Sequence, residues 1–99
     1  MPPLEQLIGM KIVSIEPVLD YWQVELSHAC ISAYNKLELS HPIADLLGAI
    51  VEMVSYQEER KLDVELSNGC WLSICLEPEQ YVGPEAFNVH FASGQIVVG

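Results

Sequence analysis

Hydrophobic and polar residues alternate in two stretches of the chain that lie about forty residues apart. Three apolar residues share one side of each stretch and three polar residues the other: Trp22, Val24 and Leu26 against Tyr21, Gln23 and Glu25, then Leu62, Val64 and Leu66 against Lys61, Asp63 and Glu65. A period of two is the pattern of a strand with one buried and one exposed face. The pattern therefore predicts two half-buried β-strands.

Apolar stretches on both sides extend each of these strands into a group of three. The preceding strands are expected at residues 10–18 and 49–56, and the following strands at 31–34 and 71–76. The second group contains Asn68-Gly69, the strongest short signal for a hairpin turn. The first group has His28-Ala29 instead, and because Ala disfavours positive φ we expect a different type of turn there.

Helical turns and a terminal hairpin complete the expected elements. Short helical turns are predicted at residues 4–8 and 43–47, each followed by a glycine that suits a helix C-cap, Gly9 and Gly48. Pro78, Gly83 and Pro84 mark a loop over 77–86. Alternation over residues 87–91 and an apolar segment over 95–98 predict the last two strands. The expected fold is mainly β (α+β with two short helices), with about eight strands.

The two groups of strands also resemble each other in sequence. Val24-Glu25-Leu26-Ser27 recurs as Val64-Glu65-Leu66-Ser67, a cysteine follows each serine three residues later, and Leu7-Ile8-Gly9 matches Leu46-Leu47-Gly48. We therefore interpret residues 1–99 as one domain with an internal repeat, 4–35 and 43–76, followed by a loop and a hairpin over 77–99. Two repeated β-meanders predict a small antiparallel barrel or a two-sheet sandwich.

The charge of the chain limits its partners. Fourteen acidic residues face four basic ones, so the net charge is −10. Nucleic-acid binding needs clustered Lys and Arg, and an acidic field repels anionic membranes, so we expect neither partner. Such a field favours a basic protein. Hydrophobic residues make up 51% of a short chain, and a domain of this size leaves apolar surface uncovered, so we also expect a homodimer.

The cysteines and the N-terminal residues indicate a cytoplasmic protein. Cys30, Cys70 and Cys75 are odd in number, and a reducing compartment leaves them as small buried hydrophobes. The first residues lack the basic and apolar regions of a signal peptide. The apolar runs are too short to span a bilayer.

The histidines, cysteines and serines form no known catalytic or metal-binding motif. His28, His41 and His90 lack metal-ligand spacing, and the sequence has no nucleophile elbow and no phosphate-binding loop. We therefore assign no catalytic residue, metal or cofactor, and expect a protein that is not an enzyme. The best candidate for an interaction site is the unduplicated loop, whose acidic and aromatic residues suit a cation or a basic partner surface: Glu77, Glu79, Tyr81, Gly83, Pro84 and Glu85.

Four short patterns are spread over most of the chain: Leu4-x-x-Leu7-Ile8-Gly9, Asp20-Tyr21-x-x-x-Glu25-Leu26, Leu66-Ser67-Asn68-Gly69 and Tyr81-x-Gly83-Pro84-Glu85-Ala86. Together they resemble a group of small uncharacterised bacterial β-rich proteins of unknown function. The resemblance implies a standalone small domain. Some similar proteins act as immunity proteins or are carried by mobile gene cassettes. The resemblance transfers no catalytic residue.

The residues leave three functions open. The first is a non-enzymatic interaction module whose acidic surface meets a basic protein, in its sharpest form an immunity-type inhibitor of a basic toxin. The second is a small-molecule-binding protein or enzyme with a pocket between the two repeats, lined by Trp22, Trp71, Tyr81 and the thiols. The third is a structural homodimer in which sheet edges pair.

Overall fold

The computed structural model describes residues 2–99, with side chains from Leu4 onward. Its elements in chain order are α1 (Pro2–Glu5), β1 (Ile12–Val18), β2 (Tyr21–Leu26), β3 (Ala29–Ala33), β4 (Leu37–Leu39), α2 (Ile43–Leu46), β5 (Val51–Gln57), β6 (Lys61–Leu66), β7 (Trp71–Cys75), the 3₁₀ turn η1 (Pro78–Gln80), β8 (Phe87–Phe91) and β9 (Ile96–Val98). No helix in this part of the chain has the length and apolar composition needed to cross a membrane.

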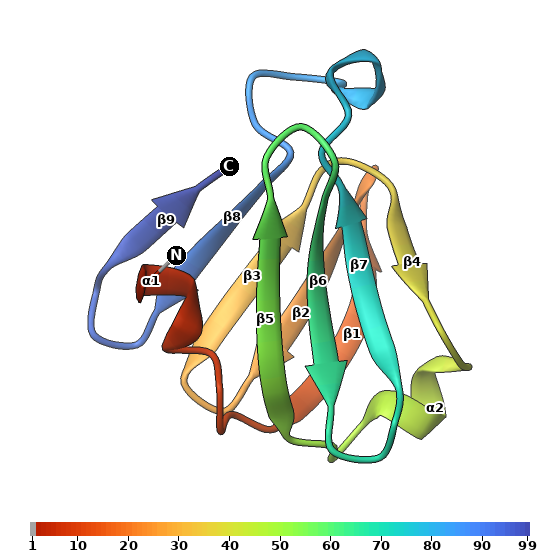
Figure 1. Cartoon of the computed structure of the whole chain (residues 1–99), viewed down its shortest axis with the longest axis vertical. Helices are drawn as coiled ribbons and strands as arrows, with labels where there is room; N and C mark the ends of the chain where they lie inside the picture. The colour runs from red at the N-terminus through yellow and green to blue at the C-terminus, as the bar shows by residue number, and fades with distance from the viewer. Residues whose placement is uncertain (1) are drawn as a thin grey trace.

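The strands form two antiparallel sheets that lie face to face (Figure 1). One sheet has the order β1-β2-β3-β8-β9 and the other the order β4-β7-β6-β5. Each sheet keeps two open edges, so the barrel that the sequence left open is wrong and the two-sheet alternative describes the fold. The mainly β character is confirmed. Of the two predicted helical turns, the one at 43–47 is present as α2, whereas the one at 4–8 is misplaced: α1 ends at Glu5 and residues 6–9 form turns, so Gly9 does not cap a helix.

Most of the predicted strands are present within two residues of their expected ends. The exception is β4, which the sequence pattern did not predict, because three residues, Leu37-Glu38-Leu39, are too short to show a period. β4 exists because it pairs with β7, Leu37 opposite Ile74 and Leu39 opposite Leu72. Its formation therefore depends on a contact with a distant part of the chain.

The first meander (β1–β3) and the second meander (β5–β7) share their local irregularities. The ladder of the first is interrupted after Ile12 and that of the second after Val51. Leu19 and Glu59, in the turns that follow β1 and β5, are the two non-glycine residues of 2–99 with positive φ, +57° and +63°. The same irregularity thus occurs at the same step of both meanders.

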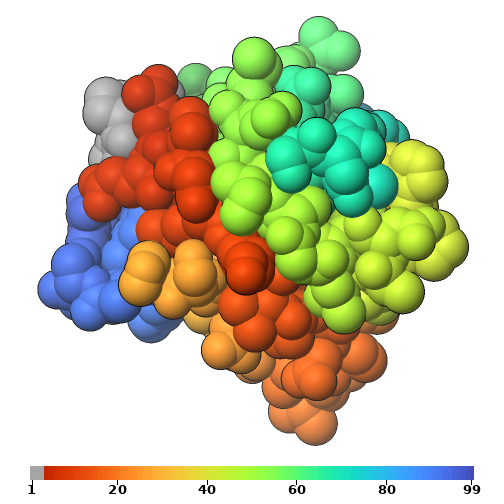
Figure 2. Space-filling view, turned by 90° about the horizontal axis from the view of Figure 1, so that it is seen from below, coloured from red at the N-terminus to blue at the C-terminus, as the bar shows by residue number. Residues whose placement is uncertain are grey.

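The two meanders meet at their starting ends, where residues 9–12 lie antiparallel to residues 48–51 (Figures 1 and 2). Backbone bonds join the segments in matched pairs: Gly9 N–H donates to Val51 O and Gly48 N–H to Ile12 O, both at 2.8 Å, while Ile12 N–H donates to Ala49 O at 2.9 Å and Val51 N–H to Met10 O at 2.8 Å. Gly9 and Gly48 have φ of +93° and +85°. Both glycines are needed, because other residues rarely adopt this conformation.

Each meander is followed by a strand that crosses to the opposite sheet. β4 follows β3 but pairs with β7, and β8 follows β7 but pairs with β3. The crossings carry a matched pair of bonds: Tyr34 N–H donates to Ala86 O at 2.8 Å, and Cys75 N–H donates to Lys36 O at 3.0 Å. β9 then extends only the first sheet.

The two cysteines matched in the sequence do not occupy equivalent positions. Cys30 pairs with the glutamate of β2, and Trp71 pairs with the corresponding glutamate of β6, so Trp71 takes the place of Cys30. The turn at residues 67–69 is one residue longer than the turn at 27–28, which moves Cys70 out of alignment. The third strands therefore align only if one residue of the second turn is skipped. The two turns differ, as expected.

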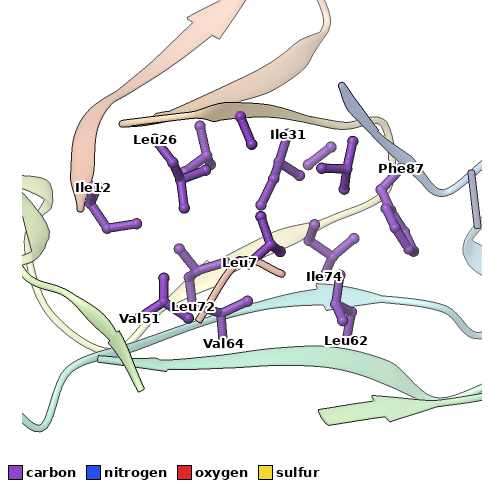
Figure 3. Close-up of a cluster of buried hydrophobic side chains, with 14 of the residues drawn as sticks. Leu7, Ile12, Leu26, Ile31, Val51, Leu62, Val64, Leu72, Ile74 and Phe87 are labelled. Carbon is purple, nitrogen blue, oxygen red and sulfur yellow. The ribbon is translucent and has the colours of Figure 1, made fainter. Parts of the chain in front are cut away.

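The core lies between the two sheets (Figure 3) and includes leucines from both helical segments. Leu7, after α1, and Leu46, at the end of α2, have no exposed surface. The apolar faces of the two alternating strands are buried as predicted, apart from Trp22, which is partly buried against the core. The outer faces of both sheets are left to polar residues and a few exposed apolar ones.

Candidate functional site

The chain topology gathers several turns at one end of the two sheets. β1 and β5 both start where the meanders meet, so the turns after them lie at the opposite end (Figure 1, top). The ends of β3 and β7 and the long predicted loop lie at that end too. We call this region the loop end and define it as residues 19–21, 34–36, 56–60 and 76–86.

The long loop is anchored at both of its ends. Leu76 is buried, and its N–H donates to Arg60 O at 2.9 Å. Ala86 has no exposed surface, and its carbonyl accepts hydrogen bonds from Tyr34 and Asn35 N–H at 2.8 and 3.0 Å. The loop is thus held by the neighbouring turns, and a loop on a rigid framework suits a binding role.

Four of the six loop residues proposed from the sequence border two shallow hollows rather than one. Tyr81, half-buried, lines a hollow of about 250 Å³ with Glu59, Leu76 and Pro78. The other three residues that border a hollow, Gly83, Pro84 and Glu85, line a second one of about 250 Å³ with Tyr34 and Val82. Glu77 and Glu79 are exposed beside η1. In the part of the chain with described side chains, no three His, Cys, Asp or Glu residues could hold a metal ion.

All four tyrosines of the chain lie at the loop end. The rings of Tyr21 and Tyr34 are 5.2 Å apart and tilted by 50°, and Asn88 Nδ2 donates to the Tyr34 hydroxyl at 2.8 Å. Tyr56 and Tyr81 rest against the core. Burial raises the pKa of Tyr56, and the nearby Tyr81 and Glu58 raise it further, so Tyr56 is a neutral phenol at physiological pH.

Carboxylates lie in the same region as these aromatic rings. Six acidic residues belong to the loop end: Asp20, Glu58, Glu59, Glu77, Glu79 and Glu85. Lys36 and Arg60 are also there, but the one salt bridge among residues 4–99 joins Lys61 to Asp63 at 3.3 Å, on an outer sheet face. Leu19 and Val82 add apolar surface, with 96% and 82% of their area exposed. The loop end is therefore acidic, aromatic and partly apolar.

The sequence indicated the loop and only part of the surface around it. The loop was identified by its Pro and Gly residues and its lack of a counterpart in the other half. From the sequence, Tyr21 and Trp71 are expected as outward aromatic residues that extend the interaction surface of Tyr81. Tyr21 does lie at the loop end, whereas Trp71 is exposed on the outer face of the four-stranded sheet. Tyr34 and Tyr56 were read only as members of strands. The available signal was that each lies at a predicted strand end next to a turn.

Cys30 lies on the outer face of the five-stranded sheet, opposite Glu25 on β2 and His90 on β8. Burial raises the pKa of its thiol, Glu25 raises it further, and a hydrogen bond with Gln23 partly opposes them. The nucleophilic thiolate is disfavoured, because both larger effects stabilise the neutral thiol. Facing His90 therefore does not make Cys30 a reactive thiol.

We expect Cys30 in the folded protein to react with iodoacetamide only at higher pH than Cys30 in the urea-unfolded chain. Glu25→Gln should move the midpoint of the pH–rate curve down, but not to the unfolded value, because burial remains. Peptide mass spectrometry measures the rate at Cys30 separately from the other two cysteines. Gln23→Ala, which removes the opposing hydrogen bond, should move the midpoint up. A folded midpoint below the unfolded one would contradict this description.

The residues proposed to line a pocket between the repeats do not come together. Trp22 rests against the core, Tyr81 lies in the loop, and Trp71 is exposed on the outer face of the four-stranded sheet. There Trp71 borders an open hollow of about 310 Å³ with Lys61, Asp63 and Glu65. The ammonium of Lys61 forms a salt bridge with Asp63 and so neutralises part of the negative charge of this hollow. The loop end is the stronger candidate. No family model, curated protein or solved structure matches the chain.

Proposed function

We propose that the chain is a non-enzymatic protein-interaction module that binds a basic protein surface through its loop end. The observation that carries the proposal is the convergence of four tyrosines and six carboxylates from distant segments of the chain. Tyrosine offers a large, stiff contact area with a polar tip, and interfaces are enriched in it. The exposed side chains of Leu19 and Val82 supply the apolar contact that such an interface also needs.

The charge of the loop end determines the kind of partner. Its carboxylates lack salt-bridge partners within residues 4–99, and the net charge of −10 adds a long-range attraction for cations. A partner rich in Lys and Arg is drawn in by this field and then forms ion pairs with the loop. An immunity-type inhibitor of a basic toxin is the sharpest form of the proposal. The free thiols of Cys30, Cys70 and Cys75 support a cytoplasmic setting.

Charge reversal in the loop tests the proposal. We expect Glu79→Lys combined with Glu85→Lys to weaken binding of the basic partner by about tenfold or more, since two favourable ion pairs become repulsive. The partner is first captured at low salt from the source cells and identified by mass spectrometry. Its affinity is then measured by isothermal titration calorimetry at two salt concentrations.

A second double variant separates the loop end from general charge. Glu16→Lys with Glu52→Lys makes the same change in net charge on β1 and β5, where both side chains are exposed. This variant should bind nearly as well as the unchanged protein. Equal weakening by both variants would show that binding depends on net charge and not on the loop end. If no basic protein is captured at low salt, the proposal is wrong.

We also infer that residues 4–35 and 43–76 are two copies of one unit within a single domain. The support is the matched set of features in the two meanders: the interrupted ladders, the positive-φ residues in the turns, and the paired bonds of Gly9 and Gly48. The strand that follows each unit in the chain, β4 or β8, pairs with the third strand of the other unit. The two units therefore share one core.

A further inference from the structure

The structure assigns a self-association surface to the edge of β9: we infer that β9 pairs antiparallel with β9 of a second copy of the chain. β9 is the last strand of the five-stranded sheet, and within residues 2–99 no strand lies along its outer edge (Figure 1). Ile96 and Val98 are 57% and 59% exposed. This surface is independent of the loop-end proposal.

The backbone of β9 presents free hydrogen-bonding groups at this edge. On the side of β8, Phe91 N–H donates to Gln95 O at 2.9 Å and Gly99 N–H donates to Phe87 O at 3.0 Å. Backbone groups alternate between the two sides of an antiparallel strand. The N–H and C=O groups of Ile96 and Val98 therefore face the open edge and are available to another strand.

The edge of β9 also lacks the features by which proteins prevent edge pairing. Charged side chains, proline and bulges are the usual protection. Each of the other edge strands carries at least one of them: Glu16 and Pro17 in β1, Glu38 in β4, and Glu52 with an interrupted ladder in β5. β9 consists of Ile96-Val97-Val98, with β-branched side chains only, and its ladder with β8 is regular.

The distribution of charge indicates that the partner strand comes from a second copy. Two copies of net charge −10 repel each other wherever their acidic surfaces meet. Residues 86–99 contain no Asp, Glu, Lys or Arg, so the β8–β9 hairpin is the part of the surface where this repulsion is smallest. A basic partner would gain nothing from this uncharged edge.

An antiparallel pair of β9 strands centred on Val97 gives hydrogen-bond partners to the outward backbone groups of both copies. Ile96 of each copy then lies opposite Val98 of the other, and the outward N–H and C=O groups of these residues exchange hydrogen bonds. The exposed side chains of Ile96 and Val98 form one apolar row across the junction, and cross-strand apolar pairs of this kind stabilise a sheet. The result is a continuous ten-stranded sheet, with a small interface and hence a weak dimer.

Sedimentation velocity and amide hydrogen exchange test this arrangement on the whole chain. We expect the dimer fraction to rise between about 10 µM and 1 mM, the range for a small interface. The amides of Ile96 and Val98 should exchange more slowly as the dimer forms, whereas those along the open edges of β1, β4 and β5 should not change. Ile96→Lys combined with Val98→Lys should keep the protein monomeric at the highest concentration.

A matched variant controls for the added charge. Val13→Lys combined with Met53→Lys places two lysines at side chains that are 49% and 54% exposed on the other edge strands β1 and β5. This variant should dimerise like the unchanged protein, and circular dichroism verifies that both variants are folded. A strict monomer at 1 mM, protection at β1, β4 or β5 instead of β9, or loss of the dimer only in the control variant would each overturn the inference.

Discussion

Replacing Leu7 or Leu46 by Ala is expected to lower the free energy of unfolding by about 2–5 kcal/mol, and by similar amounts at the two positions. Both leucines have no exposed surface and precede the glycines at the meander contact by two residues. Removing either leaves a cavity in tightly packed surroundings, where the neighbours relax only partly. Urea denaturation followed by tryptophan fluorescence measures both values under the same conditions.

The neighbouring residues supply the control. Ile8 and Leu47 follow the two buried leucines directly and are 47% and 44% exposed, so Ile8→Ala and Leu47→Ala should lower the free energy of unfolding by about 1 kcal/mol or less. Large effects at both leucines and small ones at both controls fit two equivalent units sharing a core. A large effect at Leu7 with a negligible one at Leu46 would argue against equivalent roles.

The three-stranded meanders were predictable because their signals are local. Alternation over residues 21–26 and 61–66, together with the Asn68-Gly69 turn, specified strands, faces and connections without any distant contact. Leu26 and Leu66 are buried as that alternation required. The prediction was weaker at the ends of strands, where burial and pairing shift the boundary by a residue or two.

The arrangement of the sheets was not predictable from the same signals. β4 has only three residues, and β8 has the same alternation whether it pairs within its own half or with β3. The choice depends on the combined packing of both halves. The match of Cys30 with Cys70 was wrong for a simpler reason. The second turn has one extra residue, so the residue opposite Glu65 is Trp71, whereas the residue opposite Glu25 is Cys30.

The candidate site was predictable only in part, for the same physical reason. Pro78, Gly83 and Pro84 predict a loop over residues 77–85 from the local sequence alone. The tyrosines that surround it are separated by many residues and come together because β1 and β5 start from one point and run the same way. A surface assembled from strand ends can be predicted only when the order of the strands in the sheets is known, whereas a loop can be predicted from its own sequence.

Phe87→Ala is expected to lower the free energy of unfolding by about 3–5 kcal/mol, as is typical for removal of a buried aromatic ring. Phe87 has no exposed surface and lies under the loop end. Its ring centroid is 6.4 Å from that of Tyr56, in an edge-to-face arrangement at 64°, and a Cβ on Gly99 would collide with it. The site is therefore filled, and Ala leaves a cavity beneath the proposed interaction surface.

The same variant links stability to the proposed binding surface. Without the ring of Phe87, Tyr56 loses its aromatic neighbour, so the near-ultraviolet circular dichroism of the tyrosines should weaken under conditions where the variant is still folded. Phe87→Leu, which keeps most of the apolar volume, should retain more stability than Phe87→Ala but lose the aromatic contact. Tyr56→Phe should have little effect on stability, because the ring pair persists. A change below about 1 kcal/mol for Phe87→Ala would show that the core relaxes around position 87 and that the loop end does not depend on it.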